Sequence, residues 1–302
     1  MVSIFTVDAF TDKAFSGNPA GVCIVPRSDD DTRKWSLSDT VLQNIATEMN
    51  ISETSFVTTY DRVMTNVFEL RWMTPTVEVN LCGHGTLSAA AVVFAQFGDK
   101  VGNKLLFHTL SGILVAEKNI DTGKIRMTLP INPPAVLPGP NEVHTKIFKC
   151  MNFQMEDLAE IAYSKVTKKL LICLKNFDRN KLEALQPSID SLVKIDQSAE
   201  IEKGENVKGV ILTFKDDSDS QYNFLSRYFA PWVGIPEDPV TGSAHTVLTP
   251  YWSSKMGGQK SFLARQCSKR GGDLSLQIND NANKVFVSGN AIIVLCGQLN
   301  ID

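Results

Sequence analysis

Two short segments of the chain combine a glycine with side chains that can move a proton or bind an anion. Residues 82–86 read Cys-Gly-His-Gly-Thr, and residues 237–245 read Glu-Asp-Pro-Val-Thr-Gly-Ser-Ala-His. A helix beginning at each glycine would present backbone amides that have no partner within the helix. Such a helix end carries about half a positive charge and favours an anion. We therefore expect both segments to bind an anion, most simply a carboxylate.

The two segments follow the two copies of a repeated motif. Residues 71–77 (Arg-Trp-Met-Thr-Pro-Thr-Val) resemble residues 227–233 (Arg-Tyr-Phe-Ala-Pro-Trp-Val), and a glutamate stands five residues before the glycine in both segments. Two matches in the same order indicate duplicated halves. The alternative is that an arginine and an aromatic residue before a proline only mark the end of a strand. Duplicated halves would aim two helix N-termini at one shared cleft.

Three side chains in these segments are candidates for catalysis: His84, Asp238 and Ser243. Each also has an ordinary structural interpretation. A single histidine is often a core residue, an aspartate before proline often forms a turn, and a serine at a helix start often caps it. Their placement at corresponding positions of a repeat favours a functional role for all three.

A cysteine before the first glycine is typical of two-thiol amino-acid racemases, but this chain does not carry the second thiol. The counterpart of Cys82 is Thr241, whose hydroxyl is far too weak a base. Glu53 is the candidate for moving the proton, because it lies between a predicted helix and an apolar strand, where burial would raise its pKa. Glu48 is the alternative, although its place on the helix is typical of a solvated surface acid.

A thiol hydrolase that uses Cys82 and His84 is a further alternative. Residues two apart on a turn need not face each other, and the sequence shows no third residue that would orient the histidine. The sequence therefore favours proton transfer over nucleophilic attack.

Strands predominate among the elements that must position these residues. A helix is predicted over residues 38–49, with Ser38 as N-cap and Asn50 as the stop. Residues 86–97 form a second predicted helix that is apolar on every side, so we expect a sheet to wrap around it. Residues 17–21 are predicted to form a loop. The predicted strands cover residues 3–7, 22–25, 55–59, 67–73, 168–174, 209–214, 285–287 and 291–295.

Five prolines among residues 130–140 mark the best domain boundary, because proline fixes φ and removes an amide donor. We predict an N-terminal half over residues 1–129, to which a C-terminal strand over 290–302 can add. The C-terminal half covers residues 130–289. The fold class is α+β.

The composition narrows the classes of function. The net charge of −3 over 302 residues offers no basic field, so we expect no nucleic-acid partner. Six cysteines form no CxxC pair, which argues against a zinc ribbon or a disulfide framework. The N-terminus does not resemble a signal peptide, and the uncharged window 79–98 is too polar to cross a bilayer. We expect a cytoplasmic protein that does not enter the membrane.

Four motifs together resemble the PhzF family of phenazine-biosynthesis-like isomerases. They are Gly-Asn-Pro-Ala-Gly at 17–21, Ser-Glu-Thr at 52–54, Cys-Gly-His at 82–84 and the segment 237–245. The resemblance runs over nearly the whole chain. It implies a diaminopimelate-epimerase-like fold of two similar halves, each with a sheet wrapped around a central helix. It also implies a homodimer and no metal or organic cofactor.

The resemblance also implies roles for individual residues. The acid/base glutamate carries over to Glu53, and the other active-site residues carry over to His84, Asp238 and Ser243. The positions expected to bind substrate are Asn18, Gly83, Gly85, Thr241 and Gly242. The family usually has alanine where this chain has Gly85, a change that we expect to loosen the first helical turn by about 0.5–1 kcal/mol.

The leading hypothesis is a cofactor-independent isomerase that moves a proton on a small anionic metabolite bearing a carboxylate. The alternative is an interaction protein built on an enzyme scaffold. The resemblance is strongest to an animal branch of the family, which implies binding to a WD-repeat protein (MAWD).

Overall fold

The computed structural model describes residues 1–30, 35–60, 65–217 and 221–301. The chain divides into two compact units. Unit 1 comprises residues 1–129 and 286–302, and unit 2 comprises residues 130–285. The division at 129/130 coincides with the start of the proline-rich segment. The return to unit 1 occurs at Phe286, a few residues before the position proposed from sequence.

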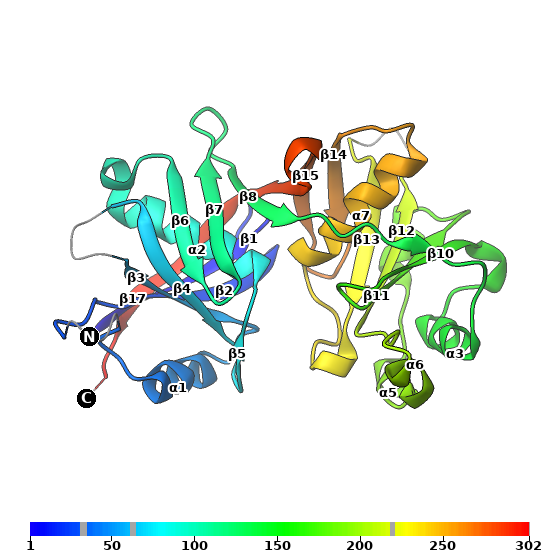
Figure 1. The fold of residues 1–302 in the computed structure, drawn as a ribbon, viewed down its shortest axis with the longest axis horizontal. Coiled ribbons are helices and arrows are strands. Elements are labelled where there is room, and N and C mark those ends of the chain that lie inside the picture. The colour runs from blue at the N-terminus through cyan, green and yellow to red at the C-terminus, as the bar shows by residue number, and fades with distance from the viewer. Residues whose placement is uncertain (31–34, 61–64, 218–220, 302) are drawn as a thin grey trace. The chain divides into compact units, whose positions relative to one another are not determined.

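Unit 1 is a curved sheet around one helix (Figure 1). Its strands are β1 (Val2–Ala9), β2 (Asn18–Ile24), β3 (Thr54–Thr59), β4 (Val67–Met73), β5 (Glu78–Val79), β6 (Lys104–Thr109), β7 (Gly112–Lys118) and β17 (Ala291–Leu299), while β8 (Ile125–Pro130) and β16 (Lys284–Gly289) cross the division between the units. Its α-helices are α1 (Asp39–Met49) and α2 (Gly83–Phe97). Helix α2 packs against β1, β2, β3, β7 and β17. The prediction of a helix enclosed by sheet is confirmed.

The local rules read from the sequence account for both helices of unit 1. The Ser38 side chain accepts a hydrogen bond from the Val41 N–H, and Asn50 ends α1 in the left-handed conformation. In α2, ten residues are buried, and they include every position from His84 to Ala90. A helix without charge on any side has no face that prefers water. The helix begins at Gly83, three residues before the predicted start.

The predicted loop over residues 17–21 is wrong, because β2 already begins at Asn18. Residues 18–24 pair antiparallel with β1, with Asn18 opposite Ala9. The Gly-Asn-Pro-Ala-Gly composition suggests a turn. A strand forms there because the backbone of β1 supplies its hydrogen-bonding partners.

Unit 2 repeats the plan of unit 1. Its strands are β9 (Ala135–Val136), β10 (Leu158–Ser164), β11 (Lys169–Leu174), β12 (Gly209–Lys215), β13 (Phe224–Phe229), β14 (Ser261–Gln266) and β15 (Gly272–Asn279). Its α-helices are α3 (Glu142–Met151), α4 (Arg179–Ala184), α5 (Ile189–Val193), α6 (Ser198–Glu202) and α7 (Gly242–Lys255).

The strand pairings show that the two units are copies. From β10 to β15, successive pairs are antiparallel, parallel, antiparallel, parallel and antiparallel. The strands β1, β2, β3, β4, β6 and β7 follow the same succession. Helix α7 follows β13 as α2 follows β4. The prediction of two similar halves is confirmed.

The repeated arginine and glutamate form the same contact in each unit. In unit 1, Arg71 Nε and Nη2 each donate to Glu78, both at 2.8 Å. In unit 2, Arg227 donates to Glu237 through the same two nitrogens at 2.6 and 2.9 Å, and Arg227 Nη1 also donates to two backbone carbonyls at the end of α4. Each pair ties a strand to the segment that leads into the enclosed helix, which in unit 1 begins with β5. Bidentate contacts of this kind are geometrically specific.

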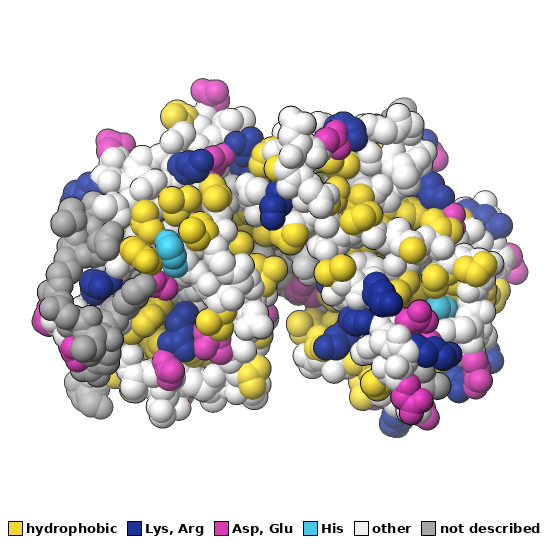
Figure 2. All heavy atoms as spheres, in the orientation of Figure 1, with side chains coloured by type: hydrophobic (Ala, Val, Ile, Leu, Met, Phe, Trp, Pro, Cys, Tyr) yellow, Lys and Arg dark blue, Asp and Glu magenta, His cyan; other side chains and the backbone are white. Residues whose placement is uncertain are grey.

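The surface carries charged side chains of both signs. On the face drawn in Figure 2, lysine and arginine are interspersed with aspartate and glutamate. In the described part of the chain, every helix falls short of the length and hydropathy that a membrane span needs.

We predict that Arg227→Lys lowers the free energy of unfolding by about 2 kcal/mol or more, because lysine keeps the charge but cannot reproduce the hydrogen bonds of the guanidinium. Arg71→Lys is the matched control, since the Arg71 side chain is 18% exposed and that of Arg227 is 8% exposed. Its cost should be about 1 kcal/mol. Urea unfolding followed by circular dichroism measures both. An equal or larger cost for Arg71→Lys would contradict the importance assigned to the buried pair.

Candidate active site

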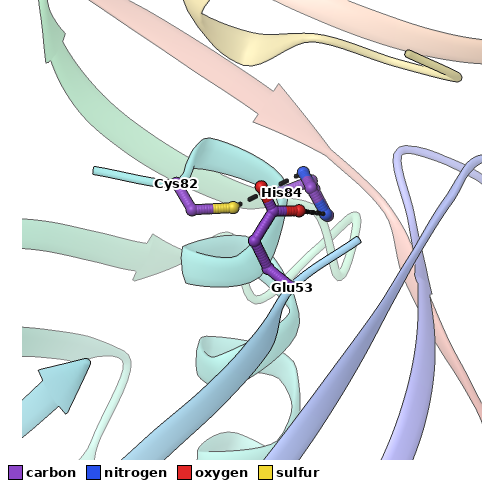
Figure 3. Close-up of side chains that lie close together, drawn as sticks. All are labelled: Glu53, Cys82 and His84. Atoms are coloured by element: carbon purple, nitrogen blue, oxygen red, sulfur yellow. Dashed lines mark hydrogen bonds and ion pairs between the residues drawn. The ribbon is translucent and has the colours of Figure 1, made fainter. Parts of the chain in front are cut away.

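Three buried side chains meet at the start of α2 (Figure 3). Glu53 immediately precedes β3, Cys82 is the N-cap residue of α2, and His84 lies in its first turn. Glu53 Oε2 lies 3.2 Å from His84 Nε2, and Cys82 Sγ lies 3.6 Å from His84 Nδ1. One imidazole ring therefore contacts the carboxylate on one side and the thiol on the other.

The backbone and a neighbouring serine hold Glu53 in place. The Gly21 N–H of β2 donates to the Glu53 carbonyl at 3.0 Å. The Ser52 hydroxyl lies 3.3 Å from His84 Nε2, so it shares that ring nitrogen with the carboxylate. Sequence reasoning assigned no role to Ser52, although it belongs to the Ser-Glu-Thr motif.

The charges of Glu53 and His84 stabilise each other. Burial opposes ionisation of Glu53, but the adjacent His84 outweighs burial and lowers the pKa of the carboxyl. Burial also disfavours a charged His84 ring, but Cys82 and Glu53 together raise its pKa well above the ordinary value. At neutral pH the two residues therefore form a carboxylate–imidazolium pair. The prediction that burial raises the pKa of Glu53 is wrong, since the effect of the histidine partner is larger.

Cys82 acts as a helix cap. Its Sγ accepts a hydrogen bond from the Gly85 N–H at 3.3 Å. Burial raises the pKa of the thiol, and the charge of Glu53 acts in the same direction, while His84 opposes both. The sequence argument that Cys82 and His84 need not face each other is wrong, since they are in contact and Glu53 lies at the opposite ring nitrogen.

Close packing explains why a glycine stands at position 85. A Cβ atom there would lie 2.8 Å from Trp72 Cδ1, 2.9 Å from Ser55 Oγ and 3.0 Å from Cys82 Sγ. The Ser55 hydroxyl donates to the Gly85 carbonyl at 3.0 Å. An alanine side chain at position 85 would clash with β3 and β4. Glycine lets the helix approach the sheet more closely, and this offsets the conformational freedom that glycine adds to the unfolded chain.

The corresponding helix start in unit 2 carries the second group of predicted residues. Thr241 is the N-cap residue of α7, Gly242 is the first helical residue, and Ser243 follows it. The Thr241 hydroxyl donates to the Asp238 carboxylate. Gln266 fixes this loop from β14, because its amide donates to the Asp238 carbonyl at 2.6 Å and accepts from the Thr241 N–H at 2.9 Å. Sequence reasoning gave Gln266 no such role.

His245, the last residue of the second motif, is neutral. It is fully buried, and burial lowers its pKa to about 4. Its Nδ1 lies 2.8 Å from the Thr241 carbonyl, and since a carbonyl only accepts, Nδ1 carries the proton. His245 therefore holds the first turn of α7 together.

Among the other predicted binding residues, Thr241, Gly242 and Gly85 lie at the two helix starts just described. Gly83 is the first residue of α2, and Asn18 is buried at the start of β2. The catalytic and binding roles assigned to these residues stay predictions, as does the shared pocket inferred from the repeat.

Glu53, Cys82 and His84 each offer one metal-ligand atom, and these atoms lie within 4.8 Å of one another. The ring of His84, however, uses both of its nitrogens, one toward the thiol and one toward the carboxylate. A metal ion bound by all three side chains would have to displace one of those contacts. The arrangement suits proton transfer better than metal binding.

Comparison with known proteins covers almost the whole chain. The family model described as phenazine biosynthesis-like protein (PhzC-PhzF) matches residues 7–297. A phenazine biosynthesis-like domain-containing protein of Rattus norvegicus is 42% identical, with 98% of each chain covered. A protein of Halalkalibacterium halodurans named as an uncharacterized isomerase is 37% identical over 98% of this chain and 97% of its own.

Solved structures share the fold. The crystal structure of a PhzF-family protein of Enterococcus faecalis is 31% identical and covers 99% of each chain, with a TM-score of 0.82. A predicted epimerase of Pseudomonas aeruginosa covers all of both chains with a TM-score of 0.69 at 18% identity, which bears on the fold alone. The predicted α+β, epimerase-like fold is confirmed.

We predict that Glu53→Gln lowers the pKa of His84, because the ring loses an adjacent opposite charge while it stays buried. An NMR titration of the His84 ring protons measures this change. Glu48→Gln is the control, since Glu48 is exposed on α1 and should leave the titration unchanged. An unaltered His84 pKa in Glu53→Gln would contradict the ion pair.

Proposed function

Since the chain belongs to the phenazine biosynthesis-like (PhzC-PhzF) family, we propose that it is an isomerase that moves a proton on a small carboxylate-containing metabolite without a cofactor. A bacterial relative is named as an isomerase. The observation that carries the proposal is the buried Glu53–His84 pair at the N-terminus of α2, with 3.2 Å between Oε2 and Nε2.

Glu53 is the proposed acid/base residue. Its carboxylate takes a proton from one carbon of the substrate, and the electron pair of that C–H bond moves into the adjacent unsaturated system. The protonated Glu53 then returns the proton to a second carbon, so that the enzyme ends as it began. Because the pKa of Glu53 is lowered, the carboxylate is in the reactive state throughout the neutral range.

His84 and the start of α2 supply the electrostatic stabilisation. When Glu53 takes the proton, its negative charge disappears and an equal charge develops on the substrate. The imidazolium and the positive end of the helix then act on the substrate instead of on Glu53. An interaction that strengthens as charge develops lowers the barrier. Asp238 and Ser243 are proposed to orient the substrate.

A thiol hydrolase is the second candidate, because Cys82, His84 and Glu53 contact one another in the order of a nucleophile, a base and an orienting acid. The raised pKa values of His84 and Cys82 argue against a thiol hydrolase. The ring that must accept the thiol proton is already protonated, and burial raises the pKa of the thiol. We therefore favour the isomerase. The homodimer and the WD-repeat partner stay predictions.

Glu53→Gln should reduce proton exchange by at least about 100-fold, the contribution typical of a general base. The assay incubates the protein with a panel of small unsaturated and hydroxylated carboxylic acids in D2O and detects deuterium in the acids by mass spectrometry. Glu48→Gln should exchange as fast as wild type. Undiminished deuterium uptake by Glu53→Gln would remove Glu53 from the mechanism.

Cys82→Ser separates the two candidate functions. Serine is a favoured N-cap residue and can accept the Gly85 N–H as the thiol does, so the variant should fold. Exchange in D2O should stay within about threefold of wild type, since the proposed mechanism makes no use of the thiol. Loss of all activity with an intact fold would favour the hydrolase.

A further inference from the structure

Unit 2 contains a buried lysine that the proposed mechanism does not use. Lys169 is the first residue of β11, and it is only 7% exposed. Within the described part of the chain, its Nζ makes no hydrogen bond and no ion pair; it lies 5.5 Å from the centroid of the Tyr228 ring. Lysine is almost never buried without a partner, because a desolvated charge costs free energy.

A missing side chain brings Tyr228 beside Lys169. Lys169 of β11 pairs with Gly209, the first residue of β12, and β13 carries Tyr228 on the other side of β12. A Cβ atom on Gly209 would lie 2.2 Å from Tyr228 Oη. Only glycine leaves room for the phenol at this point. Tyr228 is itself 7% exposed.

The repeat shows which residue of unit 1 corresponds to Gly209. Strands β3 and β4 pair in the same register as β12 and β13 relative to the repeated motif. By that register, the counterpart of Glu53 is Gly209. The phenol of Tyr228 therefore occupies the space that the first atoms of a side chain at position 209, the equivalent of Glu53, would fill. Unit 2 replaces the carboxylate of unit 1 with a phenol O–H and an ammonium group.

The charge of Asp238 partly offsets the effect of burial on Lys169. Burial lowers the pKa of Lys169 to about 8, and Asp238 acts in the opposite direction. The side chain is therefore mostly protonated at neutral pH. Burial also raises the pKa of Tyr228, so its hydroxyl is a donor. The Asp238 N–H donates to the Tyr228 carbonyl at 3.0 Å, which places this pair of donors beside a predicted site residue.

We propose that Lys169 Nζ and Tyr228 Oη form a carboxylate-binding site in unit 2. Both groups donate and neither has a hydrogen-bond acceptor among the described residues, so an anion with two oxygens satisfies them together. The identification of that carboxylate with the substrate's own rests on the proposed function. The binding of a carboxylate does not depend on it.

A structural role for Lys169 makes the opposite prediction about stability. If the ammonium supported the fold, its removal would lower the melting temperature. If it is kept for a ligand, it is a buried charge without a hydrogen-bond acceptor among the described residues, and methionine of similar length removes the cost of burying it. Lys169→Met should therefore melt at or above the temperature of the wild-type protein.

The experiment measures thermal unfolding of the full chain over a range of malonate concentrations at constant ionic strength, with the neutral malonamide as ligand control. Malonate should raise the melting temperature of wild type, since a ligand that binds the folded state stabilises it. In Lys169→Met the apparent dissociation constant should be at least about tenfold higher, the loss expected for a charge-assisted hydrogen bond. Lys208→Met, with an exposed lysine just before Gly209, should respond like wild type.

Tyr228→Phe is the second variant, because it keeps the ring and removes only the hydroxyl donor; it should weaken malonate binding by a smaller factor. Glu53→Gln should keep the malonate response even though it stops proton exchange, so failure of this site and failure of the proposed function are distinguishable. An equal response in Lys169→Met and wild type, no response in wild type, or a lower melting temperature for Lys169→Met would each overturn the proposal.

Discussion

A bidentate arginine–glutamate pair fixes the approach to the central helix in each unit. Arg71 and Arg227 stand at the same place in β4 and β13, and each holds the glutamate five residues before the enclosed helix. The planar guanidinium binds both carboxylate oxygens in only one geometry, so the pair positions the helix start relative to the strand. In unit 1 this matters directly, because Arg71 lies opposite Phe56 in β3, three residues after Glu53. The contact between Glu53 and His84 is thereby held by the sheet on one side and by the helix on the other.

The two units place different side chains on one scaffold, and the partner of each buried group decides its charge. His84 is next to a carboxylate, and its pKa rises. His245, three residues after its glycine as against one for His84, faces a backbone carbonyl, and burial lowers its pKa to about 4. Both rings are buried, so burial alone does not distinguish them. At the position equivalent to Glu53, unit 2 has Gly209, and the phenol of Tyr228 fills the space that a side chain there would need. Duplication supplied two helix starts, and differences at a few neighbouring positions placed the buried Glu53–His84 pair in one unit and the donors of Lys169 and Tyr228 in the other.

The features predicted from sequence are those that depend on local composition or on repetition. The charge-free segment 86–97 predicts an enclosed helix, Ser38 and Asn50 predict the ends of α1, and the motif spacing predicts two similar halves. Contacts across strands are beyond such reasoning. The pKa of Glu53 depends on His84, which is distant in sequence and opposite in effect to burial. The position of Lys169 beside Tyr228 depends on the pairing of Lys169 with Gly209, whose missing side chain leaves room for the phenol. Residues 17–21 were predicted as a loop because their composition favours turns, whereas pairing with β1 determines their conformation.

A carboxylate that is ionised and already paired is a weak base, and under the proposed mechanism this restricts the substrates that Glu53 can serve. Moving a proton to it gives up the attraction between Glu53 and His84, which is strong because both side chains are buried. The reaction proceeds only if the new negative charge falls where the imidazolium and the start of α2 can still reach it. A carbon next to an unsaturated carboxylate meets that condition, since the charge spreads away from the reacting carbon. A simple alkyl carbon does not, because it has no unsaturated group that could take up the electron pair of the C–H bond. The ion pair thus selects the electronic structure of the substrate before any shape complementarity applies.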